Sequence, residues 1–431
     1  MIDFNPNLFP ILRNLTIFFA AVMLFKYFVF LVLAPFHTIK EQLRELKLLK
    51  LSRQGKGDHR HYQPLVSVII PAWNEEVGVI KTLESALRNT YKRIEILVVN
   101  DGSTDKTHDT VSNFIALKAG FNDTGQKIRY LNKENGGKGT ALNHGIAAAN
   151  GEIIMTVDAD SILDKRAIQN LVRYFADSSI DAAVGNVKVA NTNNLAGLLQ
   201  NLEYTFGFYF KRAHSVLDSE YIFGGACAAF RRTKIFNNLG LFDTSNKTED
   251  IELSVRIRFH GLHNVFAEDV WCYTEGASDF TSLINQRLRW KKGRFDTFIK
   301  YRRLFFSLDR RHNRFLSWFI LPYAIFQEIQ LLFEPVGIAL LVTYSIISGD
   351  FVSLALGISF IFVSYLVAAL FNHRKASWKV ILLFPFTWPL FYLLMWVEYL
   401  ALVKSLLMVL RGDEIVWQGW KRKGIEANET L

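Results

Sequence analysis

Residues 151–160, Gly-Glu-Ile-Ile-Met-Thr-Val-Asp-Ala-Asp, join a short apolar run to two carboxylates. Residues 153–157 have the continuous hydrophobic character of a strand buried in a parallel sheet. Open α/β sheets bind ligands just beyond the carboxyl ends of their strands, where Asp158 and Asp160 would lie. Two such acids suit Mg²⁺ or Mn²⁺, which take one or two carboxylates together with substrate phosphates. The alternative is a turn whose acids cap a helix beginning near Asp164.

Strand and helix patterns alternate around this segment. Short apolar runs are followed by polar loops and then by helical patterns, which is typical of a parallel sheet with helices on both faces. The sequence therefore predicts an α/β domain. The other expected strands cover residues 66–70, 94–99, 128–131 and 182–189, and residues 221–232 are expected to be a glycine-containing loop that runs into a strand. The expected helices cover residues 77–88, 195–212 and 251–259.

Composition limits the class of protein. The 431 residues are 50% hydrophobic, which predicts two or three domains and a large core. The net charge of +10 favours an anionic partner, such as lipid headgroups or a nucleotide sugar. Nucleic acid is not expected, because no basic cluster interleaved with aromatic residues lies on a soluble module. The two cysteines, Cys227 and Cys272, lack metal-ligand spacing, which suits a reducing cytosolic location.

The N-terminal region has the pattern of a membrane anchor. Residues 15–36 are almost wholly apolar and long enough to cross a bilayer, which takes about 20 residues. Without a preceding basic region or a following cleavage site, this segment is interpreted as uncleaved. Residues 38–53 predict a basic amphipathic helix on the anionic cytosolic leaflet, which places the following chain in the cytosol. Polar residues 54–63 are a linker.

The C-terminal region predicts several further spans. Residues 315–326 are aromatic and interrupted by proline, so we expect an interfacial or re-entrant helix there. Residues 331–347 and 351–371 are expected spans, followed by a basic loop at residues 373–379. Residues 380–410 supply one long span or two short ones, giving four or five spans in all. The basic tail Lys421-Arg422-Lys423 favours five and a cytosolic C-terminus.

The expected domains are therefore an N-terminal anchor with its linker (1–63), a cytosolic catalytic domain (64–303) and a membrane region (304–431). The location predicted for the protein is the plasma membrane, which it crosses several times.

Two residues of the α/β domain could bind a nucleotide. Asp101, followed by Gly102, ends an expected strand and could accept hydrogen bonds from a ribose or a uracil ring. A solvated turn is the alternative. Lys138 lies in the glycine-rich segment 135–139, whose ammonium and backbone N–H groups could meet an anion. Such loops are commonly simple turns, and the P-loop spacing is absent here.

Residues further along the chain could act on an acceptor. Asp250 lies at the start of an expected helix, where a carboxylate can be held ionised and aimed as a general base. An acidic first turn that complements the helix dipole is the alternative. Gln286, Arg289 and Trp290 combine a permanent cation with a flat surface, which suits a diphosphate beside a sugar. They could equally form a helix face that meets lipid.

Taken in order along the chain, these motifs resemble those of the membrane-embedded, processive inverting glycosyltransferases of family 2. That family includes poly-N-acetylglucosamine, hyaluronan, chitin and cellulose synthases. The resemblance covers nearly the whole chain and differs at Trp73 and Asn100, where tyrosine and aspartate are usual. It rests on Pro71-Ala72-Trp73-Asn74-Glu75, Asn100-Asp101-Gly102, Lys138-Gly139 with Ala141-Leu142-Asn143, Asp158-Ala159-Asp160, Thr248-Glu249-Asp250 and Gln286-x-x-Arg289-Trp290.

The resemblance implies a GT-A catalytic domain, a Rossmann-like nucleotide-sugar-binding fold, between transmembrane and interfacial helices. In it Asp101 would hold the uridine of a UDP-sugar, and Asp160, with Asp158 beside it, would ligate Mg²⁺ or Mn²⁺. Asp250, preceded by Glu249 in the same motif, would deprotonate the acceptor hydroxyl. The remaining implied site residues are Gln286, Arg289 and Trp290 at the acceptor, Phe223, Gly224 and Gly225 alongside it, and Pro71, Ala72, Asn74, Glu75, Gly102 and Lys138 around the donor.

The resulting hypothesis is an inverting β-glycosyltransferase that uses UDP-N-acetylglucosamine to extend a polysaccharide and exports it. One alternative is a non-processive enzyme that adds a single sugar to a lipid acceptor such as a polyprenyl phosphate or a glycolipid. Another is a transport or scaffold subunit with an inactive transferase domain, which the intact acids disfavour. The bilayer is an expected partner, and an accessory membrane subunit is possible.

Overall fold

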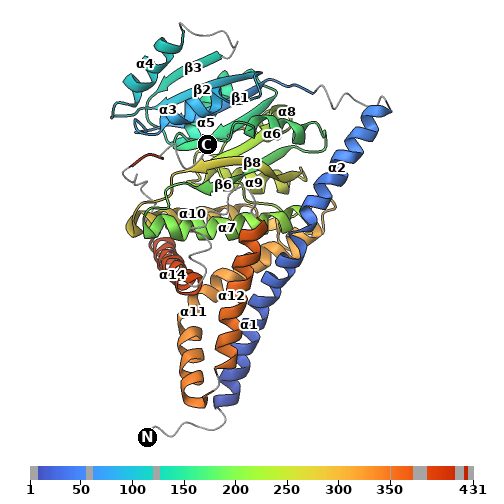
Figure 1. Cartoon of the computed structure of the whole chain (residues 1–431), viewed down its shortest axis with the longest axis vertical. Coiled ribbons are helices and arrows are strands. Elements are labelled where there is room, and N and C mark those ends of the chain that lie inside the picture. The colour runs from blue at the N-terminus through green and yellow to red at the C-terminus, as the bar shows by residue number, and fades with distance from the viewer. Residues whose placement is uncertain are drawn as a thin grey trace.

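The computed structural model describes residues 8–54, 62–119, 127–349, 351–371, 386–412 and 422–425. A sheet domain lies at one end of the molecule and long apolar helices lie at the other (Figure 1). Helices α7 (Leu195–Val216) and α10 (Phe280–Lys300) run between these two parts. The predicted residues 64–303 include this sheet domain with α7 and α10, and the domain boundaries stay a prediction.

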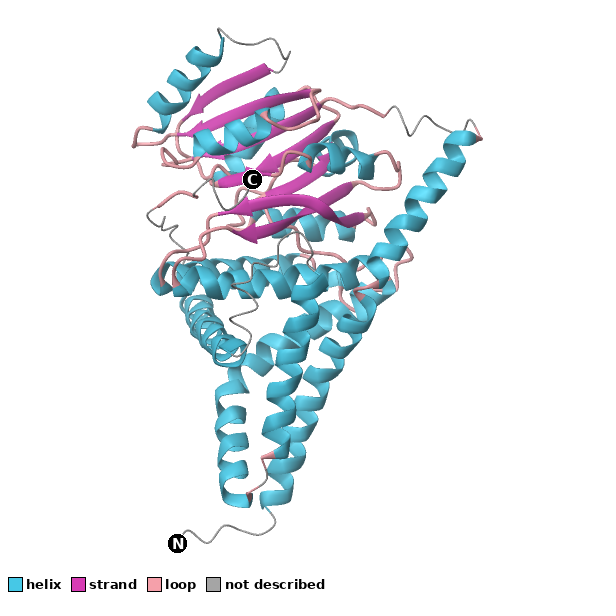
Figure 2. Cartoon of the chain, viewed as in Figure 1, coloured by secondary structure: helices cyan, strands magenta, loops and turns pink. Residues whose placement is uncertain are grey.

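The sheet has eight strands in the order β3-β2-β1-β4-β7-β6-β8-β5. The strands, magenta in Figure 2, lie together at the end of the molecule away from the long apolar helices. The strands β3, β2, β1 and β4 are parallel, as the sequence predicts. The expectation of a wholly parallel sheet was wrong, because β7 runs antiparallel to both β4 and β6, and β5 runs antiparallel to β8. The strands are β1 (Val66–Ala72), β2 (Ile94–Asp101), β3 (Lys127–Lys133), β4 (Ile153–Val157), β5 (Ser161–Leu163), β6 (Ala182–Val189), β7 (Cys227–Arg231) and β8 (Asn264–Thr274).

Buried apolar runs explain the central strands. Every residue of β2 and β4 is buried, as expected for strands covered on both faces. Helix α5 packs on β1 and β2, α6 packs on β8, and α7 packs on β6. The other helices of the sheet domain are α3 (Val79–Leu87), α4 (Thr107–Ala119), α5 (Lys138–Ala148), α6 (Ala167–Phe175), α8 (Arg232–Leu239) and α9 (Glu249–Phe259).

Strands β5 and β8 have no counterpart among the expected strands. β8 carries Glu268 and Asp269 inside it, and its pairing with β6 shifts register between Gly185 and Asn186. Charged residues and a bulge remove the regular alternation that marks a strand in sequence.

Among the described residues, three helices are long and apolar enough to cross a membrane. They cover residues 316–348, 354–371 and 387–411, and they correspond to α11 (Leu321–Ser348) with the π-helical turn before it, α12 (Val352–Phe371) and α14 (Thr387–Arg411). Helix α1 (Leu8–Leu33) takes in most of the expected N-terminal anchor. The basic loop at 373–379, residues 380–385 of the last expected span and Lys421 lie outside the described residues.

One expected boundary in the membrane region is absent from the structure. The sequence predicts a separate proline-broken helix at residues 315–326, but the helix is continuous from Leu316 to Ser348. Pro322 lies in the first turn of α11, where a missing N–H and a fixed φ are tolerated. The total of four or five spans stays a prediction.

Helix α2 (Phe36–Arg53) packs one flank against the sheet domain. His37 lies 3.2 Å from Glu268, and the Arg44 guanidinium lies 4.5 Å from the ring centre of Tyr174. Leu43 and Leu46 on the other flank are each 61% exposed. The apolar side chains of Leu43 and Leu46 are thus largely exposed in the structure, and their contact with lipid stays a prediction.

Candidate active site

The carboxyl ends of β1, β2 and β4 lie at one edge of the sheet. Because the three strands are parallel neighbours, Pro71 and Ala72 end β1 beside Asn100, and Asp101 ends β2. Asp158 follows β4 directly. The topology therefore brings the acids expected at two strand ends to one edge of the sheet.

Asp101 shapes the glycine-rich loop that precedes Lys138. It is 3% exposed and accepts hydrogen bonds from the backbone N–H groups of Gly136 (3.1 Å) and Gly137 (2.8 Å). The Nζ atom of Lys133 lies 2.5 Å from its Oδ1 atom. These contacts give Asp101 a structural role, and its binding of a nucleoside stays a prediction.

The loops after β1 and β2 are tied together. The Ser103 hydroxyl accepts a hydrogen bond from the backbone N–H of Asn74 (3.0 Å), and the Asn74 side chain accepts one from Thr104 (2.8 Å). Gly102 has φ 67°, and a Cβ there would lie 2.6 Å from the backbone nitrogen of Asn135. Only glycine fits this close approach. The loop motifs predicted around the donor thus form one surface.

The side chain of Lys138, at the start of α5, lies close to three acids that the sequence predicts for the site. Its Nζ atom lies 2.5 Å from Asp158 and 3.8 Å from Glu249. A Cβ on Gly225 would lie 2.8 Å from Lys138 Nζ and 3.3 Å from Asp250 Oδ2. Burial lowers the pKa of Lys138, but the charges of Asp158, Glu249 and Asp250 outweigh it and raise the pKa above its ordinary value. We call these four charged residues the Lys138 cluster.

Asp250 is held in one orientation by the backbone. Its Oδ2 atom accepts a hydrogen bond from the N–H of Gly225 (2.8 Å), and Oδ1 accepts one from the N–H of Ile251 (2.9 Å). A carboxylate oxygen has two lone-pair directions, so each oxygen can accept another proton donor. The geometry suits a general base that is aimed at a substrate hydroxyl.

Glu249 is the buried acid of the cluster. Burial raises the pKa of Glu249 to about 7, although Lys138 lowers it and Asp250 raises it further. The folded state therefore binds a proton at this carboxylate more tightly than the unfolded chain, whose ordinary pKa is 4.5. The stability associated with this proton is complete below pH 4.5 and is lost as the pH rises through 7.

Glu249→Gln is accordingly expected to stabilise the protein only at higher pH. Glutamine cannot ionise, so the variant avoids the cost of a buried charge, and its Tm should exceed that of the wild type by about 2–4 °C at pH 8. The difference should shrink towards pH 5. Thermal unfolding at both pH values checks this, with the exposed Glu134→Gln as the control. A Tm difference that is the same at both pH values would contradict the assignment.

Asp160 pairs with a residue from the far end of the chain. Arg422 Nη1 lies 2.7 Å from Asp160 Oδ2, and its Nε and Nη2 atoms donate to Glu75 Oε1 at 3.0 and 2.7 Å. Burial raises the pKa of Glu75 to about 8, although Arg422 lowers it. The sequence marked Arg422 only as part of a basic tail, because nothing local in a sequence reveals a contact across 262 residues.

The two predicted metal carboxylates diverge in the structure. Asp158 faces Lys138 and Asp160 faces Arg422, and among the described residues no group of three or more His, Cys, Asp or Glu side chains could hold a metal ion. A cation that is held partly by substrate phosphates needs only one or two carboxylates. Asp158 and Asp160, each balanced by a basic side chain, fit that donor set.

Helix α10 packs against α9, the helix that carries Glu249 and Asp250. Gln286, Arg289, Trp290 and Gly293 share one face of α10 at helical spacing. A Cβ on Gly293 would lie 2.0 Å from the Thr248 hydroxyl, so α10 approaches the start of α9 closely. Gln286 is 8% exposed, and its Oε1 atom accepts no hydrogen bond from the described residues. The roles of Gln286, Arg289 and Trp290 at an acceptor stay predictions.

Basic side chains of α10 pair with acids of α7 and of the apolar helix α14. Arg287 pairs with Glu203 of α7 and lies 3.1 Å from Glu398 of α14, while Lys291 lies 2.8 Å from Glu398. The Arg287 guanidinium also lies 4.2 Å from the ring centre of Trp290. Buried ion pairs of this kind fix the orientation of α10, and no motif in the sequence had indicated them.

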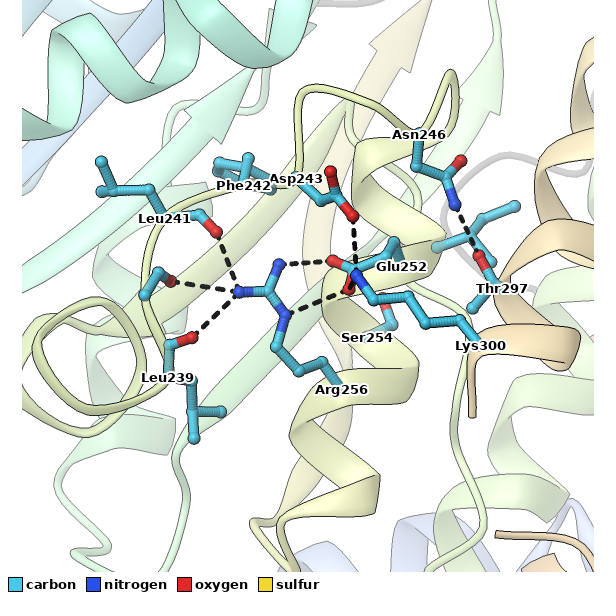
Figure 3. A network of polar contacts seen from close by, with 12 residues as sticks. Leu239, Leu241, Phe242, Asp243, Asn246, Glu252, Ser254, Arg256, Thr297 and Lys300 are labelled. Carbon is cyan, nitrogen blue, oxygen red and sulfur yellow. Dashed lines mark hydrogen bonds and ion pairs between the residues drawn. The ribbon is translucent and has the colours of Figure 1, made fainter. Parts of the chain in front are cut away.

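A polar network holds α9, which carries Glu249 and Asp250, against α10 (Figure 3). Glu252 is fully buried and accepts hydrogen bonds from Arg256 (3.2 Å), Lys300 (2.7 Å) and Tyr301 (2.5 Å). Lys300 also donates to Asp243 (2.6 Å). The network fixes the helix that presents the candidate base.

The three residues of segment 223–225 have different surroundings. Phe223 is 1% exposed and its side chain packs in the sheet core, and its place alongside an acceptor stays a prediction. Gly225 lies against Lys138 and Asp250, whereas a Cβ added to Gly224 would meet no described atom within 4 Å apart from its chain neighbours. The backbone, not the phenyl ring, is the part of this segment that faces the site.

Two family descriptions match the chain. Residues 67–236 match "Glycosyl transferase family 2", and residues 153–412 match "Glycosyl transferase family group 2". The second match covers more than half of the 431 residues.

Curated relatives show the same similarity. The chain is 33% identical over 271 residues to a probable glycosyltransferase, YdaM, of Bacillus subtilis, covering 61% of this chain and 63% of that protein. It is 27% identical over 237 residues to poly-beta-1,6-N-acetyl-D-glucosamine synthase of Staphylococcus aureus, covering 54% of this chain and 56% of that protein. The matched region thus spans about three fifths of each relative.

A solved structure has the same fold. It is the mannosyltransferase PcManGT from Pyrobaculum calidifontis in complex with GDP-Man and Mn²⁺, which aligns with a TM-score of 0.53 and 21% identity. The alignment covers 89% of this chain and all of that protein. The predicted GT-A fold is thereby confirmed.

Proposed function

The chain belongs to glycosyltransferase family 2, and we propose that it is an inverting β-glycosyltransferase that extends a polysaccharide. The proposed donor is UDP-N-acetylglucosamine and the acceptor is the end of the growing glycan. The resemblance to poly-N-acetylglucosamine synthases supports this choice of sugar.

The observation that carries the proposal is the Lys138 cluster, in which Asp250 lies beside an ammonium group at the carboxyl edge of the sheet. Transfer needs an acceptor hydroxyl to attack the anomeric carbon while a nucleoside diphosphate departs. The new bond joins the hydroxyl oxygen to the carbon, the bond from carbon to diphosphate oxygen breaks, and the hydroxyl proton goes to Asp250. General-base help of this kind contributes about 10²–10⁴-fold.

The neighbouring residues would neutralise and orient the substrates. Asp158 and Asp160 would hold Mg²⁺ or Mn²⁺, which would offset the negative charge of the diphosphate. Mn²⁺ in the mannosyltransferase complex of similar fold supports this role. Arg289 would steady the leaving group, and Trp290 and Gln286 would shape the acceptor end. Asp101 and the loop after β1 would surround the nucleoside.

The membrane helices support action at a bilayer surface. Three described helices suffice in length and composition to cross a membrane, and Arg287 and Lys291 of α10 form ion pairs with Glu398 of one of them, α14. We propose a plasma-membrane location with the catalytic domain in the cytosol and export of the glycan coupled to synthesis. An accessory membrane subunit could complete the export route.

Product size is the experiment that tests this proposal. Purified full-length protein is expected to release UDP from UDP-N-acetylglucosamine and to give a ladder of products on a gel, with masses that differ by one residue. Mass spectrometry over a panel of UDP-sugars would identify the donor. A single addition to a lipid acceptor would favour the non-processive alternative, and no UDP release with any donor would refute the proposal.

A further inference from the structure

Residues 422–425, near the C-terminus, contact a surface that is formed by separate parts of the sheet domain. We call this surface the seat. Two backbone N–H groups in the middle of the segment donate to the carboxylate oxygens of Glu275, at 2.8 and 3.1 Å. Lys81 of α3 donates to the carbonyl oxygen of Ile425 at 2.5 Å. Glu275 is itself 3% exposed, so the acceptor of the two backbone hydrogen bonds is a buried residue.

The segment is also fitted to its seat by packing. Gly424 has φ 81°, and a Cβ there would lie 2.8 Å from a methyl carbon of Val77. Glycine is needed for both the conformation and the close approach. The side chain of Ile425 is buried, with 5% exposure. A specific seat therefore receives both the backbone and the side chains of this segment.

Arg422 anchors the segment between two acids of the candidate site. Its guanidinium donates to Glu75 at 2.7 and 3.0 Å and lies 2.7 Å from Asp160 Oδ2, with 17% of its side chain exposed. A planar guanidinium is suited to binding two carboxylates at once. Arg422 thus already places a positive charge beside the Asp160 carboxylate, where a bound cation would also lie.

We propose that residues 422–425 form a strap that closes the candidate site, and that Arg422 competes with a divalent cation for the carboxylate of Asp160. The competition rests on the proposed function in one respect, namely that Asp160 ligates the cation. A hard cation prefers oxygen ligands, and the Oδ2 atom of Asp160 already faces a guanidinium at 2.7 Å. Two positive centres cannot both pair closely with this oxygen, so cation entry requires Arg422 to leave. The seated strap is an autoinhibited form of the site.

The first test measures Mn²⁺ binding to full-length protein in detergent, with UDP present at a fixed concentration to supply the phosphate oxygens and without any donor sugar. If only a fraction of the molecules have the strap displaced, the apparent affinity for Mn²⁺ is reduced in proportion to that fraction. Arg422→Gln is therefore expected to bind Mn²⁺ about tenfold more tightly than the wild type, because it loses the charge-assisted hydrogen bonds that hold the strap closed. Titration followed by the electron paramagnetic resonance signal of free Mn²⁺ gives both dissociation constants.

Lys423→Gln is the matched control for this titration. It removes the same charge one residue away and keeps the backbone N–H that donates to Glu275. Its Mn²⁺ affinity should stay within about twofold of the wild type, since a charge that is not paired with the ligand acts only through screened solvent. An equal gain in Mn²⁺ affinity in both variants would show that the effect depends only on net charge, and it would refute the proposed competition.

A second test reads the position of the strap by limited trypsin cleavage at the Lys423–Gly424 bond. The seated strap protects this bond, so cleavage should be slow in the wild type, faster when Mn²⁺ is added, and fast without Mn²⁺ in Arg422→Gln. Mass spectrometry of the released C-terminal peptide measures the rate. Equal cleavage of wild type and Arg422→Gln would overturn the strap.

The two tests separate failure of the strap from failure of the metal site. If Asp160→Asn abolishes Mn²⁺ binding while Arg422→Gln leaves it unchanged, the cation site stands and the competition is refuted. If neither the wild type nor Arg422→Gln binds Mn²⁺, the cation site and the competition are both refuted. Faster cleavage of Arg422→Gln in that case would still support closure of the site by the strap.

Discussion

Asp250→Asn is expected to lower the rate of sugar transfer by about 10²–10⁴-fold, with donor binding close to that of the wild type. Asparagine is nearly isosteric, and its side-chain oxygen can still accept the hydrogen bond from Gly225. It cannot accept the proton of the attacking hydroxyl. The loss should therefore appear in kcat and not in donor affinity.

Steady-state UDP release and equilibrium binding of UDP separate these two effects. Asp243→Asn is a suitable control, because Asp243 is another carboxylate near α9 but binds Lys300 in the supporting network instead of the Lys138 cluster. It should retain most of the transfer activity. If Asp250→Asn keeps transfer near the wild-type rate, Asp250 is not the base.

Chelation of divalent cations is expected to abolish transfer, and added Mg²⁺ or Mn²⁺ should restore it. The departing diphosphate carries negative charge that Asp158 and Asp160 would worsen without a bound cation. Asp160→Asn should resemble the chelated enzyme and should not recover when metal is added. Lys138 and Arg422 bring positive charge to these acids in the structure. Neither side chain, however, can take the place of a metal ion that is coordinated by oxygen atoms.

Transfer assays after dialysis against EDTA, followed by titration with each metal, check this expectation. Unfolding must be excluded, so the Tm of the chelated protein should be measured in parallel. Synthesis that continues unchanged in EDTA would remove the metal role of Asp158 and Asp160.

Comparison of the predicted and observed strands shows where local pattern is informative. The strands at residues 153–157 and 182–189 have the predicted bounds. For residues 153–157 the reason is that a continuous apolar run is a direct consequence of burial on both faces. Strand β8 escaped prediction, because acids and a register shift interrupt its pattern. The orientation of β7 also depends on where the chain returns, which local pattern does not encode.

By itself the sequence determined the family, the α/β class, the apolar helices and the acids at strand ends, since each depends on residue types at short spacing. Only the tertiary structure decided which charges meet. It placed Lys138 among Asp158, Glu249 and Asp250, and it brought Arg422 to Asp160 across 262 residues. Electrostatic pairing depends on distance in space, and distance in space between remote segments is set by the packing of the whole chain.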